Sequence, residues 1–121
     1  MANVVVWFDV PTTDFDRAVK FYSDILGAPV RVQEYEGQKL GFFPMDGEGS
    51  GGDIVPPGLG HTPSADGTRI YLNCDGRLDE VLGRVDRAGG TIVQRPFAIP
   101  DGKIAVISDT EGNVIGLHSS T

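Results

Sequence analysis

The spacing of apolar residues along the chain changes several times, and each change marks a predicted element. Val4–Val10 is β-branched or aromatic at all but one position, which is typical of a strand. Between Asp14 and Gly27 the apolar residues recur at helical spacing. Asp14 is a favourable N-cap and Gly27 a favourable C-cap, so a helix is predicted between them. Three further strands are predicted at Val30–Tyr35, Lys39–Pro44 and Asp53–Val55.

The second half of the chain repeats this order of elements. The segment DFDRAVKFYSDILGAPV (14–30) aligns with RLDEVLGRVDRAGGTIV (77–93), which is a spacing of 63 residues (78 − 15 = 63). The same spacing places DGEG (46–49) on DTEG (109–112), and two matches at one spacing indicate a duplicated unit. The predicted elements of this half are a strand at Arg69–Cys74, a helix at Leu78–Ala88, and strands at Thr91–Phe97, Lys103–Ser108 and Val114–His118.

The order βαβββ therefore occurs twice, and we expect an α+β fold. The two modules would occupy about residues 1–55 and 68–121 of a single domain. The segment PPGLGHTPSADG, Pro56–Gly67, is rich in proline and glycine and is typical of a linker. The segment GEGSGG, Gly47–Gly52, lacks the lysine of a phosphate-binding loop and predicts a tight turn.

Composition narrows the range of partners and compartments. The net charge of −7 repels phosphate backbones, so we expect no nucleic-acid partner. No run of about 18 apolar residues suggests a membrane span, and no secretory signal is evident. Cys74 is the only cysteine, which excludes an intramolecular disulfide and fits a reducing compartment. We therefore expect a cytoplasmic protein.

Three motifs carry a family resemblance. They are DFDRAVKFYSDILG after the first strand, RAGGTIV after the second helix, and DTEGNVIGLHS at the end. Together with the duplicated βαβββ unit, they resemble the vicinal oxygen chelate superfamily of glyoxalases, bleomycin-resistance proteins and extradiol dioxygenases. The resemblance covers nearly the whole chain. It implies that each module's mixed sheet curls into a half-barrel, and that two modules close a cup around a small-molecule ligand. Short edge strands, which need covering, join the resemblance in favouring a homodimer.

The resemblance also places four metal-ligand positions on the first and last strands of each module. In metal-dependent members these positions hold mostly His, Glu or Gln, and the metal polarises the substrate's oxygens. The corresponding residues here are Trp7, Asp53, Ile70 and Gly116. A register error of one residue gives a poorer set, namely Phe8, Ile54, Tyr71 and Leu117. Only Asp53 could bind a metal, so we expect that the site is lost and that no metal or other cofactor is used.

Five residues are candidates for ligand binding: Trp7, Asp9, Asp53, Gly116 and His118. Trp7 would provide an apolar wall, and Asp9 a polar group on the same face, although Trp7 could equally belong to the core. Asp53 follows several glycines and could instead be a turn residue. Gly116 interrupts a strand, and we expect free volume there that a ligand fills. His118 shares that face and could act as a base or donor, or serve only packing.

Other conspicuous side chains have structural interpretations. Phe21 and Tyr22 are expected in the core between helix and sheet. His61 lies in the linker and is expected to be exposed to solvent. Cys74 has no positively charged sequence neighbour that would lower its pKa, so a reactive thiol is not expected.

Two functions follow from these observations, and no catalytic residue can be assigned. The first is a metal-free protein that binds a small organic molecule in its cup, as in the bleomycin-resistance branch. The second is a lyase, isomerase or dioxygenase-type enzyme of the same superfamily. Such an enzyme would use Asp9, Asp53 or His118 in proton transfer, or would hold a metal through displaced ligands.

Overall fold

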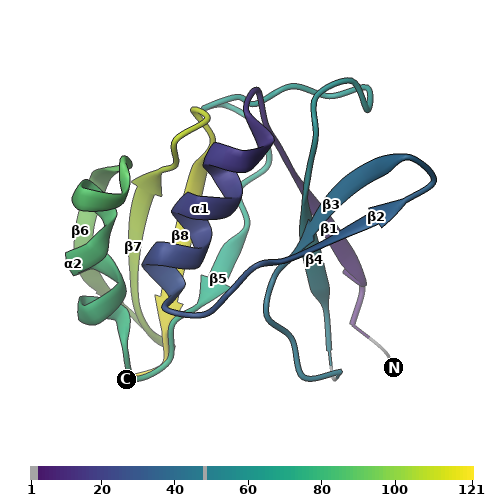
Figure 1. Ribbon diagram of the computed structural model, residues 1–121. Helices are drawn as coiled ribbons and strands as arrows, with labels where there is room; N and C mark the ends of the chain where they lie inside the picture. The colour runs from purple at the N-terminus through teal and green to yellow at the C-terminus, as the bar shows by residue number, and fades with distance from the viewer. Residues whose placement is uncertain (1–2, 48) are drawn as a thin grey trace.

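The computed structural model describes residues 3–47 and 49–121, and the predicted order βαβββ appears twice (Figure 1). The first repeat consists of β1 (Trp7–Pro11), α1 (Phe15–Leu26), β2 (Arg31–Tyr35), β3 (Gln38–Phe42) and β4 (Gly51–Val55). The second consists of β5 (Tyr71–Asn73), α2 (Leu78–Ala88), β6 (Thr91–Ile99), β7 (Gly102–Ser108) and β8 (Val114–Ser119). Each predicted strand and helix is therefore present, and the differences concern only where elements begin and end.

Two boundaries differ from expectation at the start of the first sheet. Gly51 and Gly52 belong to β4 and pair with Trp7 and Phe8 of β1, so the predicted turn at Gly47–Gly52 extends too far. Glu48, within that segment, lies outside the described residues. The residues 4–6 precede β1 and are exposed, because β4 begins opposite Trp7 and offers them no partner.

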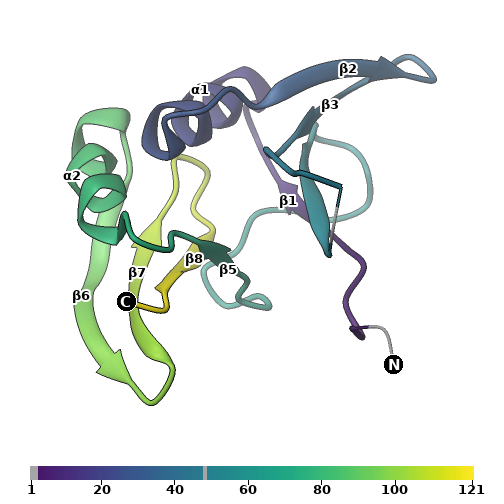
Figure 2. The ribbon, with the colours of Figure 1, turned by 90° about the horizontal axis from the view of Figure 1, so that it is seen from below.

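The strands form two separate four-stranded mixed sheets. Their orders are β1-β4-β3-β2 and β5-β8-β7-β6. In each sheet the first and last strands of the repeat are parallel, and the other neighbours are antiparallel. Both views show the two sheets side by side rather than closed into one barrel (Figures 1 and 2). The cup that the family resemblance implies is therefore open within one chain.

The helices supply much of the core. The Asp14 side chain caps α1 by accepting a hydrogen bond from Arg17 N at 3.1 Å, and Gly27 ends the helix with a φ of 66°. α1 packs against α2, and its apolar face is buried. Phe21 and Tyr22 are in this core, as predicted. Neither helix in the described part of the chain is long and apolar enough to span a membrane.

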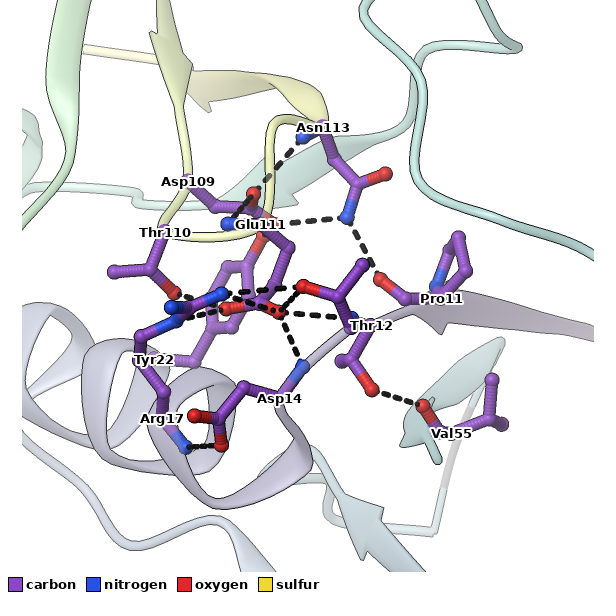
Figure 3. A network of polar contacts seen from close by, with 11 residues as sticks. Pro11, Thr12, Asp14, Arg17, Tyr22, Val55, Asp109, Thr110, Glu111 and Asn113 are labelled. Carbon is purple, nitrogen blue, oxygen red and sulfur yellow. Dashed lines mark hydrogen bonds and ion pairs between the residues drawn. The ribbon is translucent and has the colours of Figure 1, made fainter. Parts of the chain in front are cut away.

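A cluster of polar contacts connects the two modules (Figure 3). Glu111, in the turn between β7 and β8, accepts hydrogen bonds from Thr13 N at 2.9 Å and Asp14 N at 2.8 Å. It also pairs with the Arg17 guanidinium at 2.7 Å. Asn113 Nδ2 donates to the carbonyl oxygen of Pro11 at 2.9 Å. The turn before β8 therefore holds the end of β1 and the start of α1, which fixes the first strand of one module beside the last strand of the other.

The carboxylate of Glu111 is strongly stabilised in this cluster. Burial alone would raise its pKa, but hydrogen bonds from Arg17, Asp14 N, Thr110 and Thr13 N outweigh burial. The pKa of Glu111 falls to about 2 as a result. Glu111 therefore contacts the first module as an ionised carboxylate throughout the neutral pH range.

Candidate functional site

The open face of the first sheet carries three of the predicted site residues. Phe8 and Val10 of β1 point into the core, so Trp7 and Asp9 alternate to the opposite face. Asp9 lies directly opposite Asp53 in the parallel pairing of β1 with β4. The structure therefore brings Trp7, Asp9 and Asp53 together on the face that the helices leave uncovered.

Asp53 is the most perturbed group of this face. Its residue surface is only 4% exposed, and its Oδ1 accepts a hydrogen bond from Trp7 Nε1 at 3.3 Å. Burial is the main cause that raises the pKa of Asp53 to about 7, helped by a hydrogen bond and charge repulsion from Asp9. The hydrogen bond from Trp7 opposes this rise. The carboxyl group of Asp53 can therefore donate a hydrogen bond when it is protonated and accept one when it is ionised.

Two aromatic rings adjoin Asp53, those of Trp7 and Phe42. The ring of Phe42, which pairs with Asp53 across β3 and β4, meets the indole of Trp7 edge to face at 5.9 Å. The guanidinium of Arg31 lies 5.2 Å from the Phe42 ring centre. Trp7 itself remains 41% exposed, so the alternative that it belongs to the core is wrong. Asp53 is a strand residue rather than a turn residue.

The second sheet differs from expectation at Gly116. A Cβ atom on Gly116 would lie well inside van der Waals contact of the Tyr71 ring. The free volume expected above Gly116 is therefore occupied by Tyr71, and Gly116→Leu would displace that ring before it met any ligand. Tyr71 thus lies opposite Gly116 on the open face, whereas constant spacing in the sequence predicts Ile70 at the open-face position of this strand.

The first strands of the modules correspond at a different spacing from the last strands. Asp9 lies opposite Asp53 in the first module, and Tyr71 lies opposite Gly116 in the second. The spacing is 62 residues for the first strands (71 − 9 = 62) and 63 for the last (116 − 53 = 63). Ile70 consequently packs against the core instead of facing the open side. Because successive strand residues point to opposite faces, this difference of one residue moves Ile70 from the open face of β5 to its core face.

The open faces fit a divalent ion poorly. Trp7 presents an N–H donor rather than a lone pair, and Asp53 already accepts that donor. Gly116 has no side chain, and Ile70 points into the core. Among residues 3–47 and 49–121, no group of three or more His, Cys, Asp or Glu side chains is arranged to hold a metal ion.

His118 lies on the second sheet, away from the carboxyl pair, whereas His61 shares a cleft with Asp9. His118 is on β8, opposite Asn73, and its Nε2 lies 2.8 Å from the carbonyl oxygen of Asp101. His61 is exposed in the linker, as predicted, and lines a cleft of about 340 Å³ with linker residues, β1 and β8. Asp9 borders the same cleft. Cys74 is buried, and burial is the main cause that raises the pKa of its thiol, in agreement with an unreactive cysteine.

The chain belongs to the Glyoxalase/Bleomycin resistance protein/Dioxygenase superfamily, whose family model matches residues 4–117. Among solved structures it is similar to TnmS3, an antibiotic-binding protein from Streptomyces sp. CB03234. That match has 26% identity and a TM-score of 0.74, and covers 98% of this chain and 97% of that chain. The two-sheet architecture and the family match therefore agree over nearly the full chain.

Two further structures extend the comparison. A glyoxalase/bleomycin resistance protein from the same Streptomyces matches at 25% identity and a TM-score of 0.73, covering 94% of this chain and 98% of that chain. A glyoxalase/bleomycin resistance protein from Albidiferax ferrireducens matches at 18% identity and a TM-score of 0.77, covering 97% of this chain and 98% of that chain. At that lower identity the likeness shows the fold alone. Comparison with curated proteins gives no significant match.

Proposed function

We propose that this protein is a non-enzymatic binder that holds a small planar organic molecule in its cup without a metal. The single observation that carries the proposal is an exposed indole hydrogen-bonded to the buried carboxyl group of Asp53, with the exposed Asp9 opposite it on the same open sheet face. Small ligands prefer such sites, which are mostly apolar with a few placed polar groups. The carboxyl pair favours a neutral or cationic ligand and repels an anion. The antibiotic-binding description of TnmS3, which is similar over its whole length, supports this class of ligand.

The proposed loss of the metal follows from the donor chemistry. A divalent ion needs several oxygen or imidazole lone pairs, and the family's four positions offer one carboxylate that is already hydrogen-bonded to an indole. No cofactor enters the proposed function.

We further propose that the cup is completed in a homodimer. Large apolar side chains are exposed on strands of both sheets: Trp7, Val32, Tyr35, Tyr71, Val93 and Phe97. Their exposure costs free energy that the open face of a second copy would recover. The net charge of −7 makes nucleic acid an unsuitable partner, and the lone buried cysteine is consistent with the cytoplasm as the working compartment.

The experiment uses the only tryptophan of the chain as its reporter. Titration with planar antibiotics and with a cationic acridine should change the fluorescence of Trp7 saturably. Asp53→Asn should weaken the cationic acridine by about 1–3 kcal/mol, because a charge-assisted hydrogen bond is lost. Asp86→Asn, on an exposed position of α2, should bind as the wild type does. If no planar molecule changes the fluorescence of Trp7, the proposed function is wrong.

The second candidate is an enzyme of the lyase, isomerase or dioxygenase type found in this superfamily. The observation that favours it is the carboxyl group of Asp53, whose pKa of about 7 suits a general acid or base. Turnover of small keto acids that is lost in Asp53→Asn and survives EDTA would favour this metal-free enzyme over the binder. Stoichiometric nickel, zinc, manganese or iron in protein purified without chelator would instead indicate displaced ligands.

A further inference from the structure

An aromatic ring lies over a glycine on the open face of each sheet. In the first sheet, Trp7 pairs with Gly51, and a Cβ atom on Gly51 would lie 2.9 Å from Sδ of Met45 and 3.0 Å from Cζ3 of the indole. In the second sheet, Tyr71 pairs with Gly116, and a Cβ atom there would overlap the phenol ring. Both glycines are on the strand parallel to the aromatic residue. A related arrangement therefore occurs on the open face of each module, although Met45 shares the contact with Gly51 and the two aromatic residues are at different places in the repeat.

The glycines hold each ring against the sheet while leaving its other side open. Trp7 is 41% exposed and Tyr71 is 48% exposed, whereas Phe21, Tyr22 and Phe43 are buried. A ring that already packs on a neighbouring strand has lost part of its rotamer freedom before a ligand arrives. Stacking against it then costs less conformational entropy, which increases affinity.

We propose that Tyr71 is a second stacking residue for the ligand and that Gly116 is a positioning residue that seats its ring. The proposal rests on the proposed function and narrows the ligand to a flat system of several fused rings, which contacts Trp7 on one sheet and Tyr71 on the other. Single-ring compounds would engage one of the two surfaces only. The sequence suggested that the missing side chain of Gly116 makes room for a ligand. In the structure it makes room for the ring of Tyr71.

The polar groups beside the two rings determine which end of the ligand lies next to Trp7 and which lies next to Tyr71. The carboxyl pair of Asp9 and Asp53 adjoins Trp7, so this end of the ligand carries a hydrogen-bond donor or a cationic group. Beside Tyr71, the strand β7 contributes Val106, which pairs with Gly116. The next pair on that face is Asn73 and His118, neither of which is acidic, so the cationic group of the ligand lies at the Trp7 end.

The test compares proflavine, a cationic acridine of three fused rings, with benzylamine, a cation with one ring. Loss of stacking in Tyr71→Ala should weaken proflavine about tenfold and leave benzylamine unchanged. Tyr71→Phe keeps the ring and should bind proflavine as the wild type does. Asp86→Asn, on an exposed position of α2, should also leave proflavine binding unchanged.

Gly116 is tested by Gly116→Ala, whose methyl group pushes the Tyr71 ring away and should reproduce the loss seen in Tyr71→Ala. The matched control is Gly83→Ala on α2, where an added Cβ meets nothing within 4 Å. The contact between the Tyr71 ring and Gly116 can be measured by NMR in the protein without ligand. The Hα resonances of Gly116 should be shifted upfield by the ring, and Tyr71→Ala should abolish that shift, which keeps the test valid even if Gly116→Ala fails to fold.

The outcomes separate the two proposals. If Tyr71→Ala binds proflavine as tightly as the wild type, or Gly116 shows no ring-induced shift, the role of Tyr71 is overturned while the binding function stands. If neither probe changes the fluorescence of Trp7 in the wild type, the proposed function is overturned and the role of Tyr71 with it.

Discussion

Asp53 and Glu111 show how one chemical group takes opposite properties from its neighbours. Both are buried. Asp53 is desolvated by burial and also faces a second carboxyl group, so its charged form is disfavoured and its pKa rises to about 7. Glu111 is surrounded by backbone N–H donors and Arg17, so its charged form is favoured and its pKa falls to about 2. The first environment suits a binding site and the second suits a structural contact.

The raised pKa of Asp53 predicts a pH dependence of stability. The folded state binds the Asp53 proton more tightly than the unfolded chain, whose pKa is 3.8, so this contribution is fully present below about pH 4. It is lost as the pH rises through about 7. Between about pH 4 and pH 7, the free energy of unfolding of the wild type should fall by on the order of 2 kcal/mol relative to that of Asp53→Asn. Urea unfolding measures both. Asp86→Asn should follow the wild-type curve, and parallel curves for wild type and Asp53→Asn would contradict the prediction.

At the scale of elements, the start of α1 is held from both modules. Asp14 provides the local cap by binding Arg17 N, while Glu111 accepts the N–H groups of Thr13 and Asp14 from the turn before β8. The sequence identified Asp14 and gave no indication of Glu111, because the two groups are 97 residues apart. The start of α1 is therefore also the place where the turn before β8 contacts the first module.

Removal of the Glu111 side chain should destabilise the protein strongly. Its side chain is fully buried, and Glu111→Ala leaves two backbone donors and the Arg17 guanidinium without their partner. We expect a loss of about 2–4 kcal/mol in the free energy of unfolding, measured by urea titration at pH 7. The control is Glu80→Ala, which removes a surface pair with Arg84 and should cost about 0.5 kcal/mol or less. Equal costs for the two variants would show that the turn does not hold the modules together.

At the scale of the whole molecule, the two sheets leave the sides away from the helices open. Each sheet has helices on one side and exposed apolar side chains on its strands, and the sheets do not close on one another (Figure 2). A single chain thus contains two half-cups but no closed cup. A second copy that places its open faces against these would complete both at once.

We therefore expect a homodimer in solution. Static light scattering at micromolar concentration should give twice the 12.9 kDa mass of one chain. Val93→Glu, which places a charge on the exposed part of β6, should shift the mass towards one chain. Gly83→Ala, on the surface of α2, is the matched control and should not. A wild-type mass near 12.9 kDa would exclude the dimer.

The sequence by itself determined the duplicated order of elements, the local helix caps at Asp14 and Gly27, and the family. These features depend on residues close together in the chain, whose spacing records helical or strand periodicity directly. The tertiary structure alone decided that Tyr71 rather than Ile70 faces Gly116, since a strand shifted by one residue exchanges its two faces. It also decided the opposite ionisation of Asp53 and Glu111, because burial and partners from distant segments set the pKa of a carboxyl group.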